Sequence, residues 1–498
     1  MVQTINNTLE GKELDEFFEG QIVYLKNEFI NFLSQFDASD LFHKWREFIR
    51  HVDELYNITS LTSPDEDELL EFCSMEISKD PSFRLVIEIV GKRYGTTVQR
   101  RFIKSCLMLS ALNYAYSSTG QFHYCCKTLR EVIDRCQKMR LYYVTMLLFI
   151  PKYAKGRTKI DFLDLLNFFQ PQIDMCLVNI RSAYNALMVN RIIEDYKATP
   201  QPLGLAFNFD YNHLEADALE TVRLSVVDVM ESMTNEELKK VPRFGVHQLC
   251  GYDEMLEGIA VSSAVFDKYG LNELEEYKEM VNMAHDLKAF LHNDYAFIIP
   301  KESFRGLQDK YPHLNLTCDS DDFEDMLNAR PAFFQFDDMF YSSVLFYQRF
   351  MVNREQRMLE KKKKFQIDSG FVFERKIKDM LVYFGYDVKE GTKRIKRKEF
   401  DVVCVKDGCI YNFQCKNNHL TISQQGKNWF DFTCAAMKRL NKYYEKALQK
   451  EDNRDYLLKE KLGLDTVKSY VISRFPVITR NPRVINFNQL GIWLSKQK

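Results

Sequence analysis

Glycine and proline are scarce in this chain, which has 19 and 12 of them among its 498 residues. These two residues interrupt helices and form tight turns, so their scarcity favours helices over a fold of many short strands. Long apolar runs are also missing. The longest, Leu141–Ile150, is too short to cross a bilayer, because a spanning helix needs about 20 residues. We therefore expect a protein without a membrane-spanning helix.

The signals for secretion and for structural zinc are missing as well. The N-terminal residues are acidic and polar, whereas a secretory leader has a basic start and an apolar centre. The 12 cysteines form no C-x2-C pair, and the nine histidines form no H-x3-5-H pair. These patterns predict a cytoplasmic protein with reduced cysteines, and they predict neither a structural zinc site nor a disulfide framework.

The composition is that of a folded, multidomain protein. Apolar residues make up 46% of the chain, aromatic residues 14%, and the net charge is −2. Apolar side chains recur with helical spacing through the first 360 residues, for example over 41–58 and 341–354. The lysine run Lys361–Lys364 then indicates a boundary. We predict a large all-α N-terminal region over residues 1–360 and a second domain over residues 365–498.

The pattern changes from Ser369 onward. A helical stripe that includes Phe373 and Ile377 ends at Gly385, a residue that commonly follows the last turn of a helix. The elements predicted after it are three strands, a helix and a fourth strand, at 386–388, 400–405, 409–416, about 430–448 and 469–473. This order predicts an α/β domain, a sheet flanked by helices.

The dipeptide Asp407-Gly408 between two apolar runs is a strong signal for a two-residue hairpin turn. Such a turn sets the register, and it places Asp401 opposite Gln414 and Glu399 opposite Lys416. Because side chains alternate along a strand, all four would project from one face, with opposed Cβ atoms about 4.5–5.5 Å apart. Polar residues at exposed strand ends would also explain this face. The more specific interpretation is a catalytic site.

The residues of this face suit phosphodiester hydrolysis. Mg²⁺ prefers oxygen ligands, which the Asp401 carboxylate, the Gln414 amide and the Cys415 carbonyl could supply. The metal acidifies a bound water and neutralises charge on the phosphate, and Lys416 could orient that water and offset the same charge. Mn²⁺ is a possible substitute for Mg²⁺.

The segment from Glu399 to Asn417 reads EFDVVCVKDGCIYNFQCKN. It resembles the D…(E/Q)-x-K core of PD-(D/E)XK nucleases, and its glutamine is similar to that of Mrr-like restriction endonucleases. The resemblance implies a restriction-endonuclease-like fold with a mixed central sheet, with Asp401 and Gln414 in the metal site and Lys416 as the catalytic lysine. It also implies that Glu374, on the preceding helix, is an accessory acid. Glutamine in place of the second acid leaves open whether one or two metal ions bind.

A basic run directly precedes the strand that starts near Asp401. It consists of Lys393, Arg394, Lys396, Arg397 and Lys398. Such a run is commonly a solvated loop, but beside a phosphate-cleaving site it would give a sequence-independent affinity for DNA that falls with salt. Lys427 is a further candidate for nucleic-acid contact.

These observations predict a Mg²⁺-dependent endodeoxyribonuclease, with RNA left open as a substrate. The setting suggested by analogy is antiviral defence, in which the helical region would sense a partner protein or ligand and assemble a homo-oligomer. Two alternatives stay open. The domain could be an inactive nucleic-acid-binding or scaffold protein that retains the nuclease fold. Alternatively, Arg46-x4-His51 fits the R-x4-6-H pattern of HEPN ribonucleases, which would place RNA cleavage in the helical region.

Overall fold

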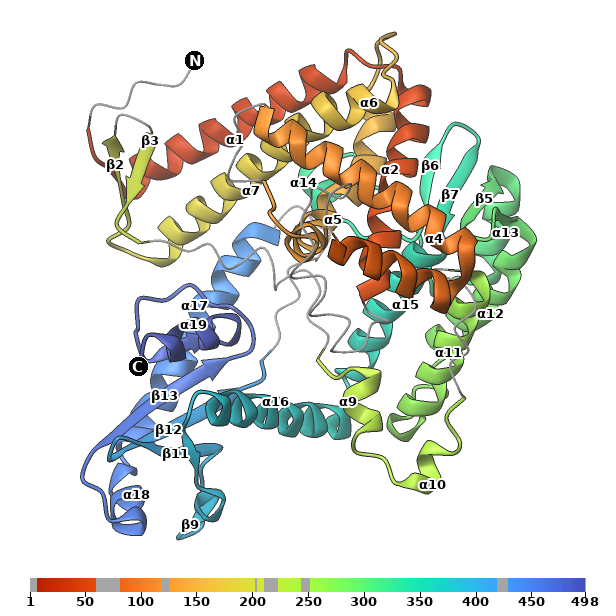
Figure 1. Cartoon of the computed structure of the whole chain (residues 1–498). Helices are drawn as coiled ribbons and strands as arrows, with labels where there is room; N and C mark the ends of the chain where they lie inside the picture. Colours follow the sequence, from red (N-terminus) through yellow and green to blue (C-terminus); the bar gives the residue numbers. More distant parts are fainter. Residues whose placement is uncertain are drawn as a thin grey trace. The chain divides into compact units, whose positions relative to one another are not determined.

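The computed structural model describes residues 7–59, 81–118, 125–201, 204–209, 223–242, 251–418 and 429–497. The chain forms two compact units (Figure 1). The helical unit comprises Val23–Ile180 and Val229–Glu355, and the C-terminal unit comprises Met1–Ile22, Arg181–Asp228 and Gln356–Lys498. The C-terminal unit thus begins its last segment near the predicted boundary, and it also takes in two segments that the sequence pattern assigns to the N-terminal region.

Most of the helical unit is α-helix. The predicted helix over 41–58 is present as α2, Ala38–Thr59, and its stripe from Leu41 to Leu55 is buried because Trp45, Phe48 and Val52 recur on one face. The unit contains all or part of α1 (Gly11–Leu33), α2, α4 (Pro81–Ser118), α5 (Leu129–Tyr153), α6 (Phe162–Asp164), α7 (Gln170–Ile192), α9 (Val226–Met230), α10 (Asn235–Leu238), α11 (Tyr252–Phe266), α12 (Glu275–Asp286), α13 (Lys301–Lys310), α14 (Phe323–Asn328) and α15 (Val344–Leu359).

The prediction that this region is all-α was wrong, because it contains a four-stranded antiparallel sheet. The strands, in the order β4-β5-β7-β6, are Leu291–His292, Ala296–Pro300, Met339–Ser343 and Phe334–Phe336. Short apolar runs of this kind fit a strand or a buried helix equally well. Asn293, Asp294 and Asp337 have positive φ angles of 51°, 55° and 50°, which Asn and Asp tolerate in tight turns. The helix predicted to start at 341 consequently starts at Val344.

The C-terminal unit is built on a mixed five-stranded sheet in the order β14-β13-β12-β11-β8, of which β13, β12 and β11 are labelled in Figure 1. β12, β13 and β14 are parallel, whereas β11 is antiparallel to both β12 and β8. The mixed sheet in this part of the chain was predicted and is confirmed. Its strands are β8 (Asp387–Val388), β11 (Val402–Lys406), β12 (Cys409–Lys416), β13 (Val467–Ser473) and β14 (Val484–Asn486). A small separate sheet joins β1 (Leu9–Glu10), β2 (Lys197–Gln201) and β3 (Gly204–Phe207).

Helices cover both faces of the mixed sheet. On one face, Phe373 and Ile377 of α16 (Lys363–Tyr383) and Leu490 of α19 (Leu490–Ser495) pack against Phe413. On the other face, Leu457 and Leu458 of α18 (Asp455–Leu462) pack against Ile410. α17 (Trp429–Asp452) contacts this second face, where the Asn412 amide donates to Glu451 over 2.9 Å. The predicted α/β arrangement therefore has two helices on each face.

The basic run before β11 is a hairpin rather than the predicted loop. Its strands are β9 (Arg394–Ile395) and β10 (Lys398–Glu399), which pair antiparallel. Lys396 and Arg397 form the turn with positive φ angles of 44° and 67°, as a two-residue hairpin turn requires. Such angles are uncommon for lysine and arginine, so the sequence carried no turn signal at this place.

Within the described residues, no helix is long and apolar enough to cross a membrane.

Candidate active site

The β11–β12 hairpin has the register that the sequence predicted. Val402 pairs with Phe413 and Lys406 pairs with Cys409 across the Asp407-Gly408 turn, whose residues have φ angles of 49° and 71°. The next residues outward are Asp401 and Gln414, and the Gln414 side-chain amide donates a hydrogen bond to Asp401 Oδ2. The hairpin turn therefore fixes the central pair of the candidate site.

The prediction for Glu399 was wrong. Glu399 pairs with Arg394 in the β9–β10 hairpin and is exposed, so it does not lie opposite Lys416. The strand β11 begins only at Val402, and the chain before Asp401 turns back into the short hairpin. The predicted face is consequently limited to Asp401, Gln414 and Lys416.

Asp401 is a partly buried carboxylate with several donors around it. The main-chain N–H of Cys415 donates to its Oδ2 over 2.8 Å, in addition to the Gln414 amide. Burial raises the pKa of Asp401 above its ordinary value, although the positive charge of Lys416 and these hydrogen bonds act in the opposite direction. The nearby Glu451 carboxylate raises the pKa further. Asp401 is thus held in an environment that does not fully neutralise its charge.

Glu374 of α16 joins the site from the other face of the sheet. Burial raises the pKa of Glu374, and the negative charge of Asp401 is the next largest cause. Its Oε2 lies 3.7 Å from the Nζ of Lys393, which belongs to the basic run. The structure therefore brings the predicted accessory acid near enough to Asp401 for the Asp401 charge to raise its pKa.

The donors that gather here fit a divalent cation. Two carboxylates, an amide and a main-chain carbonyl are all oxygen donors, the kind that Mg²⁺ prefers. The Lys416 carbonyl accepts from the main-chain N–H of Arg474 on the β13 side, so the carbonyl of the preceding residue, Cys415, faces the Asp401 side. Coordination by Gln414 requires its amide to rotate, because its N–H group points at Asp401. No cluster of three or more His, Cys, Asp or Glu side chains suited to a metal occurs in the part of the chain that the structure describes.

Lys416 ends β12 on the same face as Gln414 and beside α17. Its Nζ lies 5.5 Å from the ring centroid of Tyr443, a residue of α17 whose ring is 47% exposed. Sequence reasoning missed Tyr443, because a tyrosine on an amphipathic helix carries no distinguishing signal. The lysine charge lies within the roughly 6 Å range of a cation–π interaction with this ring.

A second group that sequence reasoning missed lies directly after Lys416. Arg223 donates to the carbonyl of Asn417, although the two residues are 194 positions apart. The Asn417 amide donates to Ser369 Oγ over 2.9 Å, and Ser369 Oγ donates to the Arg223 carbonyl over 3.1 Å. Arg474 is close enough for the Arg223 charge to affect it, since burial and then Arg223 lower its pKa to about 10. A buried arginine, Arg223, and a partly buried one, Arg474, thus lie near the end of β12.

The candidate nucleic-acid residues of the basic hairpin are all exposed. Lys396 is paired with Glu460 over 2.6 Å and Lys393 with Glu374. Among the described residues, no carboxylate pairs with the other three, Arg394, Arg397 and Lys398. The remaining candidate, Lys427, lies outside the described residues. The hairpin therefore presents charge that a polyanion could neutralise.

No family model matches the chain, and neither a curated protein nor a solved structure is similar to it. Function consequently has to be argued from the geometry of the chain itself.

Proposed function

We propose that the C-terminal unit is a Mg²⁺-dependent nuclease that acts on DNA. The observation that carries the proposal is the pairing of Asp401 with Gln414 at the open end of the β11–β12 hairpin, with Lys416 on the same face. A partly buried carboxylate whose charge raises the pKa of a second one, Glu374, would be stabilised by a bound cation. This arrangement agrees with the D…Q-x-K motif that the sequence contains.

The chain's own residues divide the reaction into distinct tasks. A divalent cation bound there would lower the pKa of a water and offset the charge that develops on the phosphate. Asp401 and Glu374 would hold that cation, while Gln414 and the Cys415 carbonyl would complete its oxygen ligands. Lys416, near the ring of Tyr443, would stabilise the negative charge of the transition state and orient the attacking water. The exposed basic hairpin would bind the backbone of the nucleic acid.

The alternative is a domain that binds nucleic acid without cutting it. The observation in its favour is the hydrogen bond from the Gln414 amide to Asp401, which satisfies the carboxylate without any metal. This alternative predicts salt-sensitive binding and no cleavage with Mg²⁺ or Mn²⁺. A ribonuclease centred on His51 would instead keep its activity after any change at Lys416.

The test uses the full chain with plasmid DNA, linear DNA, single-stranded DNA and RNA, with Mg²⁺, with Mn²⁺ and with EDTA. Asp401→Asn and Lys416→Met should each lower metal-dependent cleavage by about a hundredfold or more, as the loss of one group that stabilises transition-state charge typically does. Asp407→Asn and Lys406→Met, at the opposite end of the same hairpin, are the matched controls and should cleave normally. Equal cleavage by all four variants would refute the assignment.

The biological setting that fits this activity is defence against foreign DNA, with the helical unit as the regulatory part. One site of this kind cuts one strand, so cleavage of both strands would need at least two copies of the chain. We therefore expect a homo-oligomer as the active form. Sedimentation of the protein with and without DNA tests this expectation independently of catalysis.

A further inference from the structure

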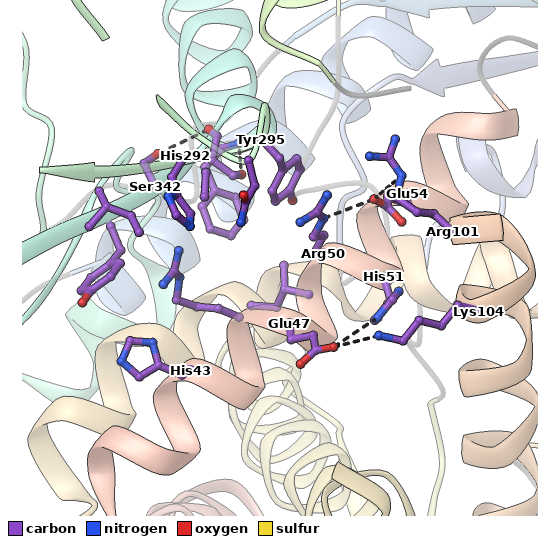
Figure 2. Close-up of a pocket in the computed structure, with 18 residues that line it drawn as sticks. His43, Glu47, Arg50, His51, Glu54, Arg101, Lys104, His292, Tyr295 and Ser342 are labelled. Carbon is purple, nitrogen blue, oxygen red and sulfur yellow. Dashed lines mark hydrogen bonds and ion pairs between the residues drawn. The ribbon is translucent and has the colours of Figure 1, made fainter. Parts of the chain in front are cut away.

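The helical unit contains a pocket of about 540 Å³ that lies between helices and the four-stranded sheet (Figure 2). One wall is the face of α2 from His43 to Glu54, whose residues recur at helical spacing. The opposite wall comes from β5 and β7, where Ile298 pairs with Tyr341 and both side chains line the pocket. This volume lies within the range of small-molecule sites, roughly 300–1,000 Å³.

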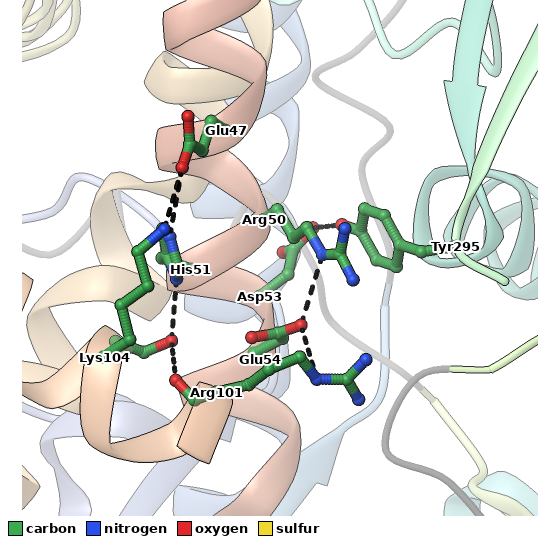
Figure 3. Close-up of polar contacts among 9 residues, drawn as sticks. Glu47, Arg50, His51, Asp53, Glu54, Arg101, Lys104 and Tyr295 are labelled. Carbon is green, nitrogen blue, oxygen red and sulfur yellow. Dashed lines mark hydrogen bonds and ion pairs between the residues drawn. The ribbon is translucent and has the colours of Figure 1, made fainter. Parts of the chain in front are cut away.

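The pocket has more positive than negative side chains. Arg46, Arg50, Arg101 and Lys104 line it, against only two carboxylates, Glu47 and Glu54. The two carboxylates already have partners: Glu54 pairs with two arginines, and Glu47 pairs with Lys104 and lies near His51 (Figure 3). Glu54 Oε1 lies 3.2 Å from the Nε of Arg50 and 3.4 Å from that of Arg101. Glu47 Oε1 lies 3.0 Å from the Nζ of Lys104 and 3.8 Å from the Nε2 of His51.

Arg46 is the residue whose charge is left uncompensated. Its guanidinium lies 4.3 Å from the ring centroid of Tyr341 and 6.0 Å from that of Phe42. Among the described residues, Arg46 has no carboxylate partner. Burial lowers its pKa, which shows that the charge is partly removed from water. A desolvated cation without a counter-charge is costly for a fold, and an anionic ligand would offset that cost.

The other groups of the pocket are held in place before any ligand arrives. Arg50 lies over the ring of Tyr295 at 4.9 Å, and the Tyr295 hydroxyl donates to the buried Asp53 over 3.0 Å. Ser105 Oγ donates to the Arg101 carbonyl over 3.0 Å, and His51 Nδ1 forms a hydrogen bond of 2.9 Å with the same Ser105 oxygen. Such fixed side chains lose little freedom on binding, which favours affinity.

Two histidines of the pocket have lowered pKa values, and burial is the largest cause for both. Burial, followed by the charge of Lys104, lowers the pKa of His51 to about 4. Burial and then Arg46 lower the pKa of His43, on the same helix. A histidine with a pKa of about 4 is a weak proton acceptor at neutral pH, so His51 is poorly suited to general-base cleavage of RNA.

We propose that this pocket binds a small phosphorylated ligand of nucleotide size with at least two phosphate groups. Arg46 and Arg50 are one helical turn apart, roughly 6 Å along the axis, so they would contact two neighbouring anionic groups. Arginine suits phosphate because its planar fork donates two parallel hydrogen bonds. The apolar part of the wall, with Ile49, Ile298 and Phe346, would contact the uncharged part of the ligand. The site consists of residues of the helical unit and does not depend on the nuclease proposal.

The experiment is calorimetric titration of the full chain in EDTA with ATP, ADP, pyrophosphate, inorganic phosphate, adenosine and a short single-stranded oligoribonucleotide. ATP or ADP should bind at least tenfold more tightly than adenosine or inorganic phosphate, and more tightly than pyrophosphate. Arg46→Gln should weaken this binding at least tenfold. The exposed Lys104→Gln should weaken it by a smaller factor and keeps the test valid if Arg46→Gln fails to fold. Arg305→Gln, an exposed arginine of the same unit, is the control and should bind normally.

The proposal would be overturned if no phosphorylated probe binds, or if only the oligoribonucleotide binds. It would also be overturned if ATP binds no more tightly than adenosine or than pyrophosphate. Normal binding by both pocket variants would overturn it as well. Titration of Asp401→Asn separates this site from the nuclease site. This variant should bind ATP as the parent does, whatever its cleavage activity. Loss of ATP binding in Asp401→Asn would place the ligand at the C-terminal site and refute the pocket.

Discussion

Gln414→Glu would restore the second acid of the D…(E/Q)-x-K motif, and the structure predicts a strongly metal-dependent effect on stability. In the parent, the Gln414 amide donates to the Asp401 carboxylate, whose pKa burial already raises. The substitution replaces this donor by a second carboxylate. Without metal the variant should be destabilised, whereas with Mg²⁺ the added oxygen ligand should recover much of the loss.

The size of the effect follows from two contributions. A hydrogen bond to a charged group contributes about 1.5–3 kcal/mol, and this is lost. Two unit charges about 4 Å apart repel by about 4 kcal/mol at an effective dielectric constant of about 20. The two acids can share one proton. The destabilisation from their repulsion therefore cannot exceed the free energy needed to protonate one of them. We expect a loss of about 3–5 kcal/mol in EDTA and a recovery of about 2.7 kcal/mol at Mg²⁺ concentrations a hundredfold above Kd.

The assay is urea unfolding of the full chain in EDTA and in Mg²⁺, followed by a signal from the C-terminal unit. Gln449→Glu, an exposed glutamine of α17, is the matched control and should be insensitive to Mg²⁺. If Mg²⁺ raises the unfolding free energy of neither Gln414→Glu nor the parent above its value in EDTA, then no cation binds at these residues, and the metal site is refuted.

Two further predictions concern other parts of the chain. Burial raises the pKa of Glu355 to about 7, and Ser262 Oγ donates to its carboxylate over 2.9 Å. Because folding then takes up a proton, the free energy of unfolding should fall by roughly 3 kcal/mol as the pH rises from about 4.5 to about 7. Glu355→Gln should remove this pH dependence in denaturant titrations between those values. An unchanged pH dependence in the variant would contradict the burial argument. In the basic hairpin, the double variant Arg397→Gln/Lys398→Gln should reduce the slope of log affinity for DNA against log salt by about 1.8, as the loss of two phosphate contacts requires. A slope equal to that of the parent, with Lys12→Gln as the exposed control, would exclude the hairpin from the interface.

Sequence reasoning found the Asp401–Gln414 pair because local rules determine it. Asp407-Gly408 specifies a two-residue turn, the turn specifies the register, and the register brings Asp401 to Gln414. The helix stop at Gly385, whose φ is 80°, follows from the same kind of rule. The prediction failed one step further out at Glu399, because Lys396 and Arg397 adopt turn angles for which the sequence offers no signal.

The contacts that sequence reasoning missed are long-range. Arg223 reaches Asn417 from a segment that precedes the C-terminal domain by more than a hundred residues, and no local pattern connects the two. The same limit applies to the sheet of the helical unit, since Ile298 and Tyr341 become neighbours only when β5 and β7 pair. Sequence spacing did place Arg46 and His51 together on α2, but only the pairing of those strands shows that they line a pocket.

Each candidate site contains a charged group that its neighbours compensate only in part. This group is the Asp401 carboxylate in one site and the Arg46 guanidinium in the other. Around Asp401, burial raises the pKa of the carboxyl despite the nearby charge of Lys416, so this carboxylate favours a positive ligand. Around Arg46, carboxylates are fewer than cations, so the pocket favours a negative one. In each case the partly desolvated charge destabilises the fold, and a ligand of opposite charge would offset this cost. Packing of the fold does not by itself require such a charge. The two ligand classes therefore follow from the same physical argument, and each titration tests it separately.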